Sequence, residues 1–197
     1  MARVARHPRT GAPRGTGGPA DGSRTGRCSG GTGHVISLRD LTRADVPAVR
    51  LIYDVGSVAF LPRGPMGEDE ALAYVRTVGR DASGARSVHT FGVDADGDLV
   101  GVVRLRVSAP HGHLSYILRR DAWGHGHATR AVTLLLAFAF GSLGLSAVHA
   151  KHHPDNERSG RVLSRVGFVR TAAAGRESCY VLCREAYDPC PPIAGRE

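Results

Sequence analysis

The spacing of apolar residues divides the chain from Val35 onward into segments of strand and helix character. Alternation of apolar and polar residues is typical of strands, and apolar residues that recur every three or four positions are typical of helices. Strands are expected at 35–39, 88–93, 99–107, 113–118, 147–151, 168–171 and 178–184. Helices are expected from Thr42, from Glu68, and over 125–140 and 156–166. This order predicts an α/β (α+β) fold in which helices pack on a mixed sheet.

Local signals mark the boundaries of these elements. Thr42 followed by Asp45 is typical of a helix start, and the pair Asp96-Gly97 is typical of a two-residue hairpin turn. Gly167 follows the helix 156–166 at the position where a glycine commonly ends a helix. The helix 125–140 is apolar nearly all round, so we expect it to be buried on all sides.

The first 34 residues have a different composition from the rest. They hold nine glycines, three prolines and six arginines against one acidic residue, Asp21. A segment with so little apolar surface cannot offset the entropy that ordering would cost. We therefore expect a disordered Arg/Gly-rich tail over 1–34, one domain over 35–188 and a flexible C-terminus over 189–197.

The net charge follows the same division. Of the formal charge of +8, the tail carries +5 and the other residues carry +3. The domain is therefore nearly neutral, and we expect nucleic-acid binding to be weak and confined to the tail. The alternatives are that the tail has no role or that it extends the chain upstream of its true start.

The sequence lacks the features of membrane, secreted and metal-binding proteins. No apolar run reaches the roughly 18 residues of a membrane-spanning helix. The N-terminal residues include arginines but lack the apolar segment that a secretory signal contains. Cys28, Cys179, Cys183 and Cys190 form no CxxC pair, which favours free thiols in a reducing, cytoplasmic setting. The histidines form no HExxH or Cys/His ligand set, so we expect no metal.

The stretch from Tyr116 to Thr129 runs from a strand through a glycine-bearing turn into a helix. At such a junction, backbone N–H groups point outward at the positive end of the helix dipole, where they bind phosphate. Gly124, Gly126 and the small Ala128 would let a ligand approach the backbone closely. A Walker A loop is excluded because Gly-Lys-Ser/Thr is absent, and a dinucleotide-binding fingerprint is excluded because Thr129 replaces its third glycine.

Two segments together carry a family resemblance. The first reads Leu-Arg-x-Asp-Ala-Trp-Gly-x-Gly-x-Ala-Thr over 118–129. The second reads Pro-Asp-Asn-x-x-Ser over 154–159, followed by Leu-x-x-x-Gly-Phe over 163–168. They resemble the GNAT superfamily of N-acetyltransferases, and most of all its RimJ/RimL-like branch, over about Val35 to Asp188. The resemblance implies a GNAT-like mixed, mostly antiparallel twisted sheet flanked by helices in a single domain.

The resemblance further implies that acetyl-CoA is the co-substrate. The backbone of the strand before the turn would pair with its pantetheine arm, and the N–H groups of the turn would hold its pyrophosphate, helped by partial positive charge on His125 and His127. Asn156 would hydrogen-bond the pantetheine arm, act as a helix N-cap, or do both. The implied cofactor-binding residues are Tyr116, Ile117, Leu118, Gly124, His125, Gly126, His127, Ala128, Thr129 and Asn156.

Three residues are implied to take part in catalysis. The N–H of Leu118 would polarise the thioester carbonyl. Ser159 would assist the departing CoA thiolate, or be an ordinary solvent-facing serine. Leu163 stands where many relatives carry a tyrosine, which excludes a tyrosine general acid there. His113 stands ten residues before Trp123, where RimL-like sequences often carry a glutamate base; the imidazole can take the proton, and water or a plain strand-end histidine are the alternatives.

These residues predict an N-acetyltransferase in which a primary amine attacks acetyl-CoA directly in a ternary complex. The acceptor would be a protein N-terminus or a small-molecule amine, bound by the loop 56–66 and the second helix. Two alternatives stay open: a non-catalytic acyl-CoA-binding regulatory module, and a nucleic-acid-associated protein that acts through its tail. Arg104 and Arg106 share one strand face, which is either solvated or part of a site for acidic substrates. Acyl-chain preference and oligomeric state are not encoded in any readable pattern.

Overall fold

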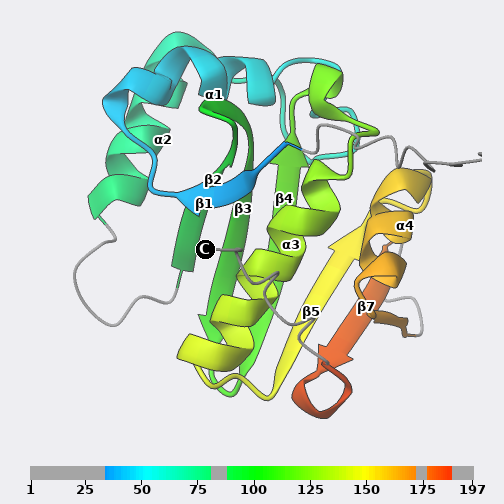
Figure 1. Cartoon of the computed structure of the whole chain (residues 1–197). Helices are drawn as coiled ribbons and strands as arrows, with labels where there is room; N and C mark the ends of the chain where they lie inside the picture. The colour runs from blue at the N-terminus through cyan, green and yellow to red at the C-terminus, as the bar shows by residue number, and fades with distance from the viewer. Residues whose placement is uncertain (1–33, 81–87, 172–176, 188–197) are drawn as a thin grey trace, which may run out of the picture. The chain divides into compact units, whose positions relative to one another are not determined.

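The computed structural model describes residues 34–80, 88–171 and 177–187. The predicted tail 1–34, apart from its last residue, and the predicted C-terminal segment 189–197 lie outside the described residues. Within the described residues, seven strands form one sheet in the order β1-β2-β3-β4-β5-β7-β6 (Figure 1). The strands are β1 (Ile36–Arg39), β2 (Val88–Ala95), β3 (Asp98–Ser108), β4 (His111–Leu118), β5 (Ala147–His152), β6 (Val169–Arg170) and β7 (Ser178–Cys183).

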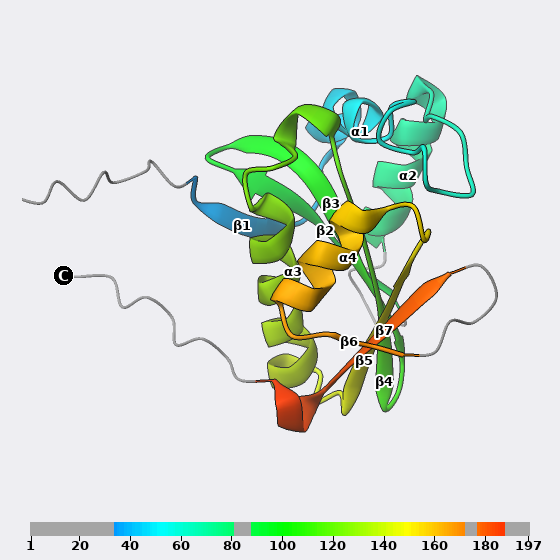
Figure 2. The same cartoon turned by 90° about the vertical axis from the view of Figure 1, so that its right-hand side faces the viewer.

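Helices pack on both faces of this sheet. Helices α1 and α2 lie on one face, and α3 and α4 lie on the other (Figure 2). The α-helices are α1 (Val46–Ile52), α2 (Glu68–Arg80), α3 (His127–Ala137) and α4 (Glu157–Arg165). Shorter helical turns are η1 (Arg43–Asp45), η2 (Arg120–Ala122), the π-helical η3 (Phe138–Ser142) and η4 (Arg184–Ala186).

The strand pairing confirms the predicted mixed and mostly antiparallel sheet. Every neighbouring pair is antiparallel except β4 and β5, which run parallel. The hairpin between β2 and β3 turns at Asp96 and Gly97, both with positive φ, as the sequence predicts. The parallel pair β4–β5 is short, because its register extends only over residues 111–114 and 147–150.

Two apolar cores lie on opposite sides of the sheet. The larger core lies between the sheet and α3 with α4, and it includes Leu114 and the partly buried Tyr116 of β4. The smaller core lies under α1 and α2 and includes Val102 of β3 and Ile117 of β4. Successive residues of β4 thus point alternately to the two cores, as the predicted strand alternation requires. One face of β4 therefore packs toward α3 and α4, and the other packs toward α1 and α2.

Helix α3 differs from its prediction in start and in burial. It begins at His127 instead of residue 125, because Gly126 adopts the left-handed conformation (φ 79°) and caps the helix. Its inner face is buried, but Thr133 and Leu134 on the outer face are exposed, with Leu134 at 41%. The prediction of a helix buried on all sides is wrong, because the sheet covers only one side of α3.

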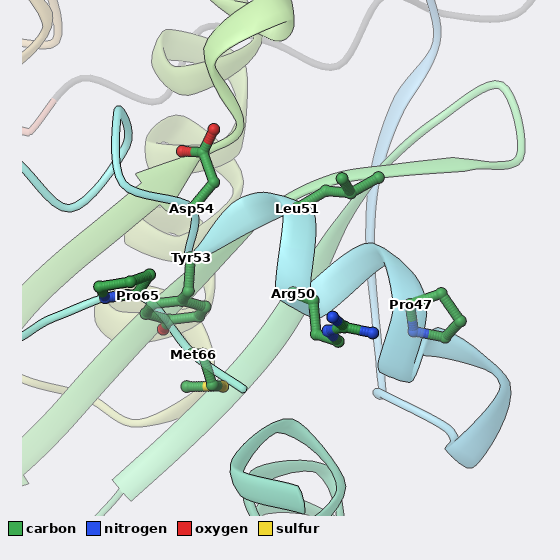
Figure 3. A pocket seen from close by; sticks show the side chains of 7 residues that line it. All are labelled: Pro47, Arg50, Leu51, Tyr53, Asp54, Pro65 and Met66. Carbon is green, nitrogen blue, oxygen red and sulfur yellow. The ribbon is translucent and has the colours of Figure 1, made fainter. Parts of the chain in front are cut away.

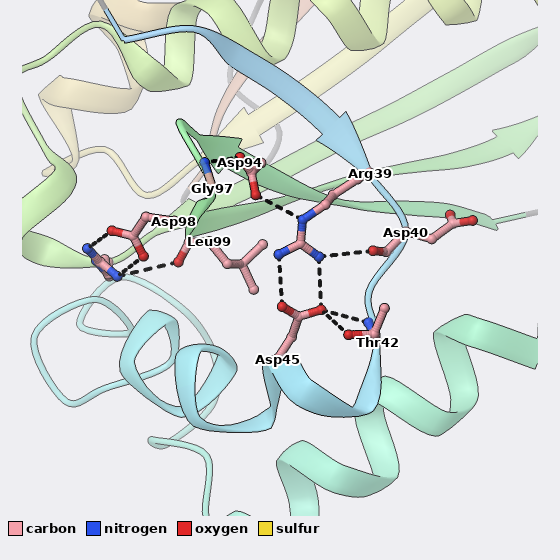
Figure 4. Close-up of polar contacts among 9 residues, drawn as sticks. Arg39, Asp40, Thr42, Asp45, Asp94, Gly97, Asp98 and Leu99 are labelled. Atoms are coloured by element: carbon pink, nitrogen blue, oxygen red, sulfur yellow. Dashed lines mark hydrogen bonds and ion pairs between the residues drawn. The ribbon is translucent and has the colours of Figure 1, made fainter.

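A charged network joins β1, β2 and the start of the helical region. Arg39 donates through Nε to Asp94 (2.9 Å) and through Nη2 to Asp45 Oδ1 (2.8 Å) (Figure 4). Asp45 Oδ2 in turn accepts the backbone N–H of Thr42 (2.7 Å), which confirms the predicted helix start. The hydrogen bond from Arg39 is the main reason why the pKa of Asp45 lies below its usual value. Asp45 therefore stabilises the fold in its charged form.

We expect Asp45→Asn to lower the free energy of unfolding by about 1–3 kcal/mol, because the nearly buried carboxylate loses its charge toward Arg39. The measurement is urea denaturation at pH 7. The difference from the wild type should shrink as the pH falls through the lowered pKa of Asp45, since the wild-type carboxylate is then neutralised as well. Glu157→Gln is the matched control: its ion pair with Arg161 is exposed, and a change below about 0.5 kcal/mol is expected. Equal losses in both variants would contradict this role of Asp45.

Candidate functional site

The parallel strands β4 and β5 separate halfway along their length. Their last paired residues are Leu114 and Ala150. Beyond this point β4 continues to Leu118 paired with β3, and β5 continues to His152 paired with β7. The two strands diverge toward their C-terminal ends (Figure 1). The sheet therefore has an opening between residues 115–118 of β4 and the end of β5.

Only alternate residues of β4 turn their peptide groups toward this opening. In an antiparallel ladder, successive peptide groups point alternately toward the neighbouring strand and away from it. The N–H of Arg119 donates to the carbonyl of Val100 in β3 (3.0 Å), so by alternation the peptide groups of Ile117 also face β3. Tyr116 and Leu118 therefore face the opening. Ile117, whose backbone was also predicted to line it, does not.

The glycine-bearing turn lies at the open N-terminus of α3. Gly124 (φ 87°) and Gly126 (φ 79°) both have positive φ, which an L-residue rarely adopts, and space around both positions is open. The first intrahelical donor is the N–H of Arg130, which bonds the carbonyl of Gly126 (3.1 Å). The helix geometry thus leaves the N–H groups of His127, Ala128 and Thr129 without intrahelical partners. This is the anion-binding geometry that the sequence predicts for the turn.

His127 does not supply the positive charge predicted for it. Its side chain is buried (5% exposed), and neither ring nitrogen has a hydrogen-bond partner among the described residues. Burial lowers the pKa of His127, and repulsion from His125 and His34 lowers it further. The imidazole is therefore neutral at pH 7 and packs as part of the protein interior. His125, which is exposed, remains beside the turn.

Trp123 connects the turn to the end of β4. Its indole Nε1 donates to the carbonyl of Leu118 (2.9 Å), and the guanidinium of Arg158 in α4 lies over its ring at 5.3 Å. The carbonyl of Leu118 is thus occupied, while the N–H of the same residue points into the opening. The sequence motif contains Trp123 but does not predict these contacts.

Residues predicted on α4 meet a side chain from β4. Asn156 caps α4 by accepting the N–H of Ser159 on Oδ1 (3.2 Å), which confirms its expected N-cap role. The hydroxyl of Ser159 donates to the phenol oxygen of Tyr116 (2.8 Å), and that phenol donates to the carbonyl of Ser159 (3.2 Å). Burial raises the pKa of Tyr116 to about 12, so the phenol keeps its proton at neutral pH. Sequence analysis named Tyr116 only for its backbone; strand alternation toward α4 is the signal that could have revealed the phenol.

A second polar pair lies under the first turn of α4. His152 Nε2 is 3.3 Å from the hydroxyl of Tyr180, and their rings stack with centres 5.3 Å apart. A Cβ at Gly160 of α4 would come within 3.0 Å of the imidazole and 3.2 Å of the phenol. The glycine thus lets α4 approach β5 and β7 closely. Leu163, one turn further, is buried in the larger core and excludes a phenol from that place.

The other proposed catalytic residue, His113, lies on the opposite face of the sheet from Ser159. It is exposed, and its ring stacks on that of His149 at 5.4 Å, while His111 meets His149 at 5.3 Å. Burial, followed by repulsion from these two neighbours, lowers the pKa of His149. His113 therefore belongs to the side of the opening that α1 and α2 flank, and Ser159 belongs to the side of α3 and α4.

The loop between α1 and α2 reaches across the same side of the sheet. The ring of Phe60 lies 5.7 Å from that of His153, which follows β5. A surface hollow of about 380 Å³ also borders this loop, between α1 and residues just before α2 (Figure 3). None of the predicted catalytic or cofactor-binding residues lines this hollow, but two residues of the loop predicted to bind the acceptor do; its walls are Pro47, Arg50, Leu51, Tyr53, Asp54, Pro65 and Met66.

The family of the chain follows from its match to a family model. Residues 36–169 match the acetyltransferase (GNAT) domain. The chain belongs to the GNAT acetyltransferase family. Both the predicted family and the predicted fold are therefore confirmed. The uncharacterized N-acetyltransferase p20 of Bacillus licheniformis is 38% identical over 57 residues, which make up 29% of this chain and 32% of p20. That alignment spans only about a third of the length of p20.

Solved GNAT structures share the fold of this chain. Mycobacterium smegmatis RimJ in complex with CoA-disulfide has a TM-score of 0.66 and 21% identity, and the match covers 78% of this chain and 84% of RimJ. Spermidine N-acetyltransferase from Vibrio cholerae, in complex with CoA and spermine, has a TM-score of 0.65 and 18% identity. That match covers 77% of this chain and 97% of the Vibrio protein. Because both identities are below 25%, these matches show a shared fold and nothing about the substrate of this chain.

Other expectations concern metals, thiols and membranes. Among the described residues, no group of three His, Cys, Asp or Glu side chains is arranged to hold a metal ion. Cys179 and Cys183 are free thiols, while Cys28 and Cys190 lie outside the described residues. None of the helices in the described part of the chain has the length and apolar character needed to cross a membrane. The cytoplasmic setting stays a prediction.

His127→Phe should make the fold less sensitive to acid. Because the pKa of buried His127 is lowered, the unfolded chain binds a proton below about pH 6.5 that the folded chain does not, so stability falls as the pH drops. Removing this group should lower the slope of the unfolding free energy against pH by up to about 1 kcal/mol per pH unit between pH 7 and pH 5.5. His149, whose pKa is also lowered, keeps part of the slope.

The measurement is urea denaturation at several pH values in this window. Replacing an imidazole without hydrogen-bond partners by an apolar ring should cost little stability at pH 7. An unchanged pH slope in the variant, with the fold intact, would show that His127 is not kept neutral in the folded protein.

Proposed function

We propose that the chain transfers an acetyl group from acetyl-CoA to a primary amine, which attacks the thioester directly in a ternary complex. The observation that carries the proposal is the opening between β4 and β5, where the peptide groups of Tyr116 and Leu118 face away from β3. These groups offer an extended ligand the hydrogen bonds of a missing strand. The open N-terminus of α3, linked to Leu118 through Trp123, offers backbone donors for a pyrophosphate.

The residues of the two motifs suit acetyl-CoA as the donor. Gly124, His125, Gly126, Ala128 and Thr129 surround or form the open end of the helix, and His127 contributes its backbone N–H. Asn156 keeps one side of its amide free for the pantetheine arm, because the N-cap bond occupies only Oδ1. Structures with this fold have been solved with CoA or its disulfide bound, which supports the same use here.

The acyl transfer needs a base, a donor for the oxyanion and an acid. The acceptor ammonium loses a proton to His113 or to water on the α1–α2 side, and its nitrogen then attacks the acetyl carbonyl carbon. The N–H of Leu118 stabilises the oxygen of the tetrahedral intermediate. The carbon–sulfur bond breaks as the nitrogen releases its second proton, and the hydroxyl of Ser159, held by Tyr116, relays a proton to the departing thiolate. The products are the acetylated amine and CoA.

The acceptor is proposed to be a protein N-terminus or a small-molecule amine. The two motifs place the chain with the RimJ/RimL-like branch, and RimJ itself is among the structures with a similar fold. The loop 56–66 and α2 flank the side of the sheet on which His113 lies, so we propose that they bind the acceptor there.

The proposal predicts that the purified full-length chain releases CoA from acetyl-CoA when a suitable amine is present. A thiol-trapping assay with a panel of peptides and small amines measures the release, and equilibrium titration measures acetyl-CoA affinity separately. His113→Ala should lower kcat by about a hundredfold or more, because general bases contribute at least this much, while the Kd of acetyl-CoA stays within about twofold.

Two outcomes would overturn parts of this proposal. Saturable acetyl-CoA binding without turnover on any amine would favour the non-catalytic acyl-CoA-binding module. Full activity in His113→Ala would leave water as the base. Arg43→Gln, which alters an exposed arginine in η1, serves as the control variant with wild-type kinetics.

Tyr116 and Ser159 should act as one unit. Ser159→Ala should lower kcat about a hundredfold, because the leaving thiolate loses its proton donor. Tyr116→Phe should lower kcat about tenfold, because it removes the phenol that holds the serine hydroxyl at 2.8 Å. In the double variant the loss should equal that of Ser159→Ala alone, which a double-mutant cycle on kcat measures. Additive losses would show that the two hydroxyls act independently.

A further inference from the structure

The side of the opening that faces α1 and α2 has a distinct charge. Directly paired residues of a sheet point to the same side, so the pairs Arg104–Ser115, Arg106–His113 and His113–His149 place five polar side chains on one surface. Arg106, His113 and Ser115 are exposed, and Arg104 and His149 are half-buried. We call the surface formed by these five residues the cationic face. It begins where the smaller apolar core ends, next to Val102 and Ile117.

The two arginines of the cationic face lack an ion-pair partner in the described part of the chain. Among the described carboxylates, none forms an ion pair with Arg104 or Arg106. Glu177, which directly precedes β7, pairs with Lys151 at 2.6 Å instead. The lowered pKa of His149 keeps that ring neutral at pH 7. The lasting positive charge of this face therefore resides on the two guanidinium groups.

Of the two arginines of the cationic face, Arg104 stands closer to the opening in the register of the sheet. Its partner Ser115 is the first residue of β4 beyond the last β4–β5 pair. The hydroxyls of Tyr53 and Tyr74 lie 3.4 Å apart, and burial raises the pKa of both, but the charges of Arg104 and Arg63 counteract this rise. Arg104 and the two phenols lie on the same side of the sheet.

Arg63 differs from Arg104 because its charge is already balanced. Its guanidinium lies 4.9 Å from the centre of the Tyr53 ring and pairs with Glu70 at 2.6 Å. Arg104, opposite Ser115 where the opening begins, has hydrogen-bond donors that no carboxylate of the described residues takes. A guanidinium in this state is suited to bind a planar anion through two parallel hydrogen bonds.

On the basis of the proposed acetyltransferase function, we propose that the acceptor is a primary amine that carries a carboxylate, and that Arg104 binds this carboxylate. The carboxylate is the missing counter-charge of the cationic face, and it holds the amine beside Ser115 and His113. A polyamine or another purely cationic acceptor would meet the repulsion of two arginines that pair with none of the described carboxylates. The carboxylate can belong to a free amino acid or to the acidic first residue of a peptide.

Matched acceptors that differ only in charge test this inference. One pair is β-alanine and β-alaninamide; the other is a tripeptide amide that begins with aspartate and its counterpart that begins with asparagine. Spermidine is the cationic probe. With the full-length chain and saturating acetyl-CoA, kcat/KM for CoA release should be about ten- to a hundredfold higher for the carboxylate member of at least one pair. The pair that shows the preference identifies the source of the carboxylate.

Variants assign the preference to Arg104. Arg104→Gln should lower kcat/KM for the carboxylate acceptor about tenfold or more and leave its neutral partner within about threefold. Arg104→Lys should retain part of the preference, because it keeps the charge but loses the two parallel hydrogen bonds. Arg104→Glu should favour spermidine over the carboxylate acceptor. Thermal unfolding checks that each variant folds, and Arg43→Gln controls for the loss of one arginine outside the cationic face.

The outcomes separate this inference from the proposed function. Turnover of neutral or cationic amines at rates equal to or above those of the carboxylate amines would overturn the inference while the acetyltransferase function stands. If Arg104→Gln lowered kcat/KM equally for both members of a pair, Arg104 would support the site without binding the carboxylate. Absence of CoA release with every amine of the wider panel would overturn the proposed function, and the inference with it.

Discussion

The end of the β4–β5 ladder at the Leu114–Ala150 pair is the constraint on which the site depends. A strand that loses its neighbour leaves a row of peptide groups that must find other partners. Here the carbonyl of Leu118 bonds the indole of Trp123, and the phenol of Tyr116 reaches across to Ser159. The indole from the turn thus takes the position of a donor on a paired strand, while α4 holds the side chain of Tyr116. What they leave exposed is the backbone edge proposed to bind acetyl-CoA.

The sheet itself separates the two halves of the proposed reaction. The donor side carries the open N-terminus of α3, the cap of α4 and the Tyr116–Ser159 pair. The acceptor side carries His113 and the cationic face, flanked by α1 and α2. Because side chains of β4 point alternately to the two sides, one strand carries both Tyr116, proposed to act near the leaving group, and His113, proposed to act on the entering amine. The strand separation connects the two sides at the point where acyl transfer is proposed.

Sequence reasoning predicts what local chemistry determines. The capping pair Thr42–Asp45, the hairpin at Asp96-Gly97 and the glycine turn all have local signatures, and the structure contains each of them. Contacts between distant segments have no such signature. The bond of Tyr116 to Ser159 joins residues 43 positions apart, and only the folded sheet brings them together. The burial of His127 was missed for the same reason, because its position in an anion-binding turn suggested charge while tertiary packing keeps it neutral.

The Tyr116–Ser159 pair also changes the meaning of the absent tyrosine on α4. Leu163 fills the larger core, so a phenol at that position would have to enter an apolar environment. Tyr116 brings a phenol to the same helix from the sheet, and its pKa of about 12 keeps it a hydrogen-bond donor at neutral pH. It is therefore suited to orient the hydroxyl of Ser159 and poorly suited to act as a base. The leucine at position 163 of α4 thus does not deprive the donor side of a phenol. What matters there is where the phenol lies in the fold, and β4 supplies it through Tyr116.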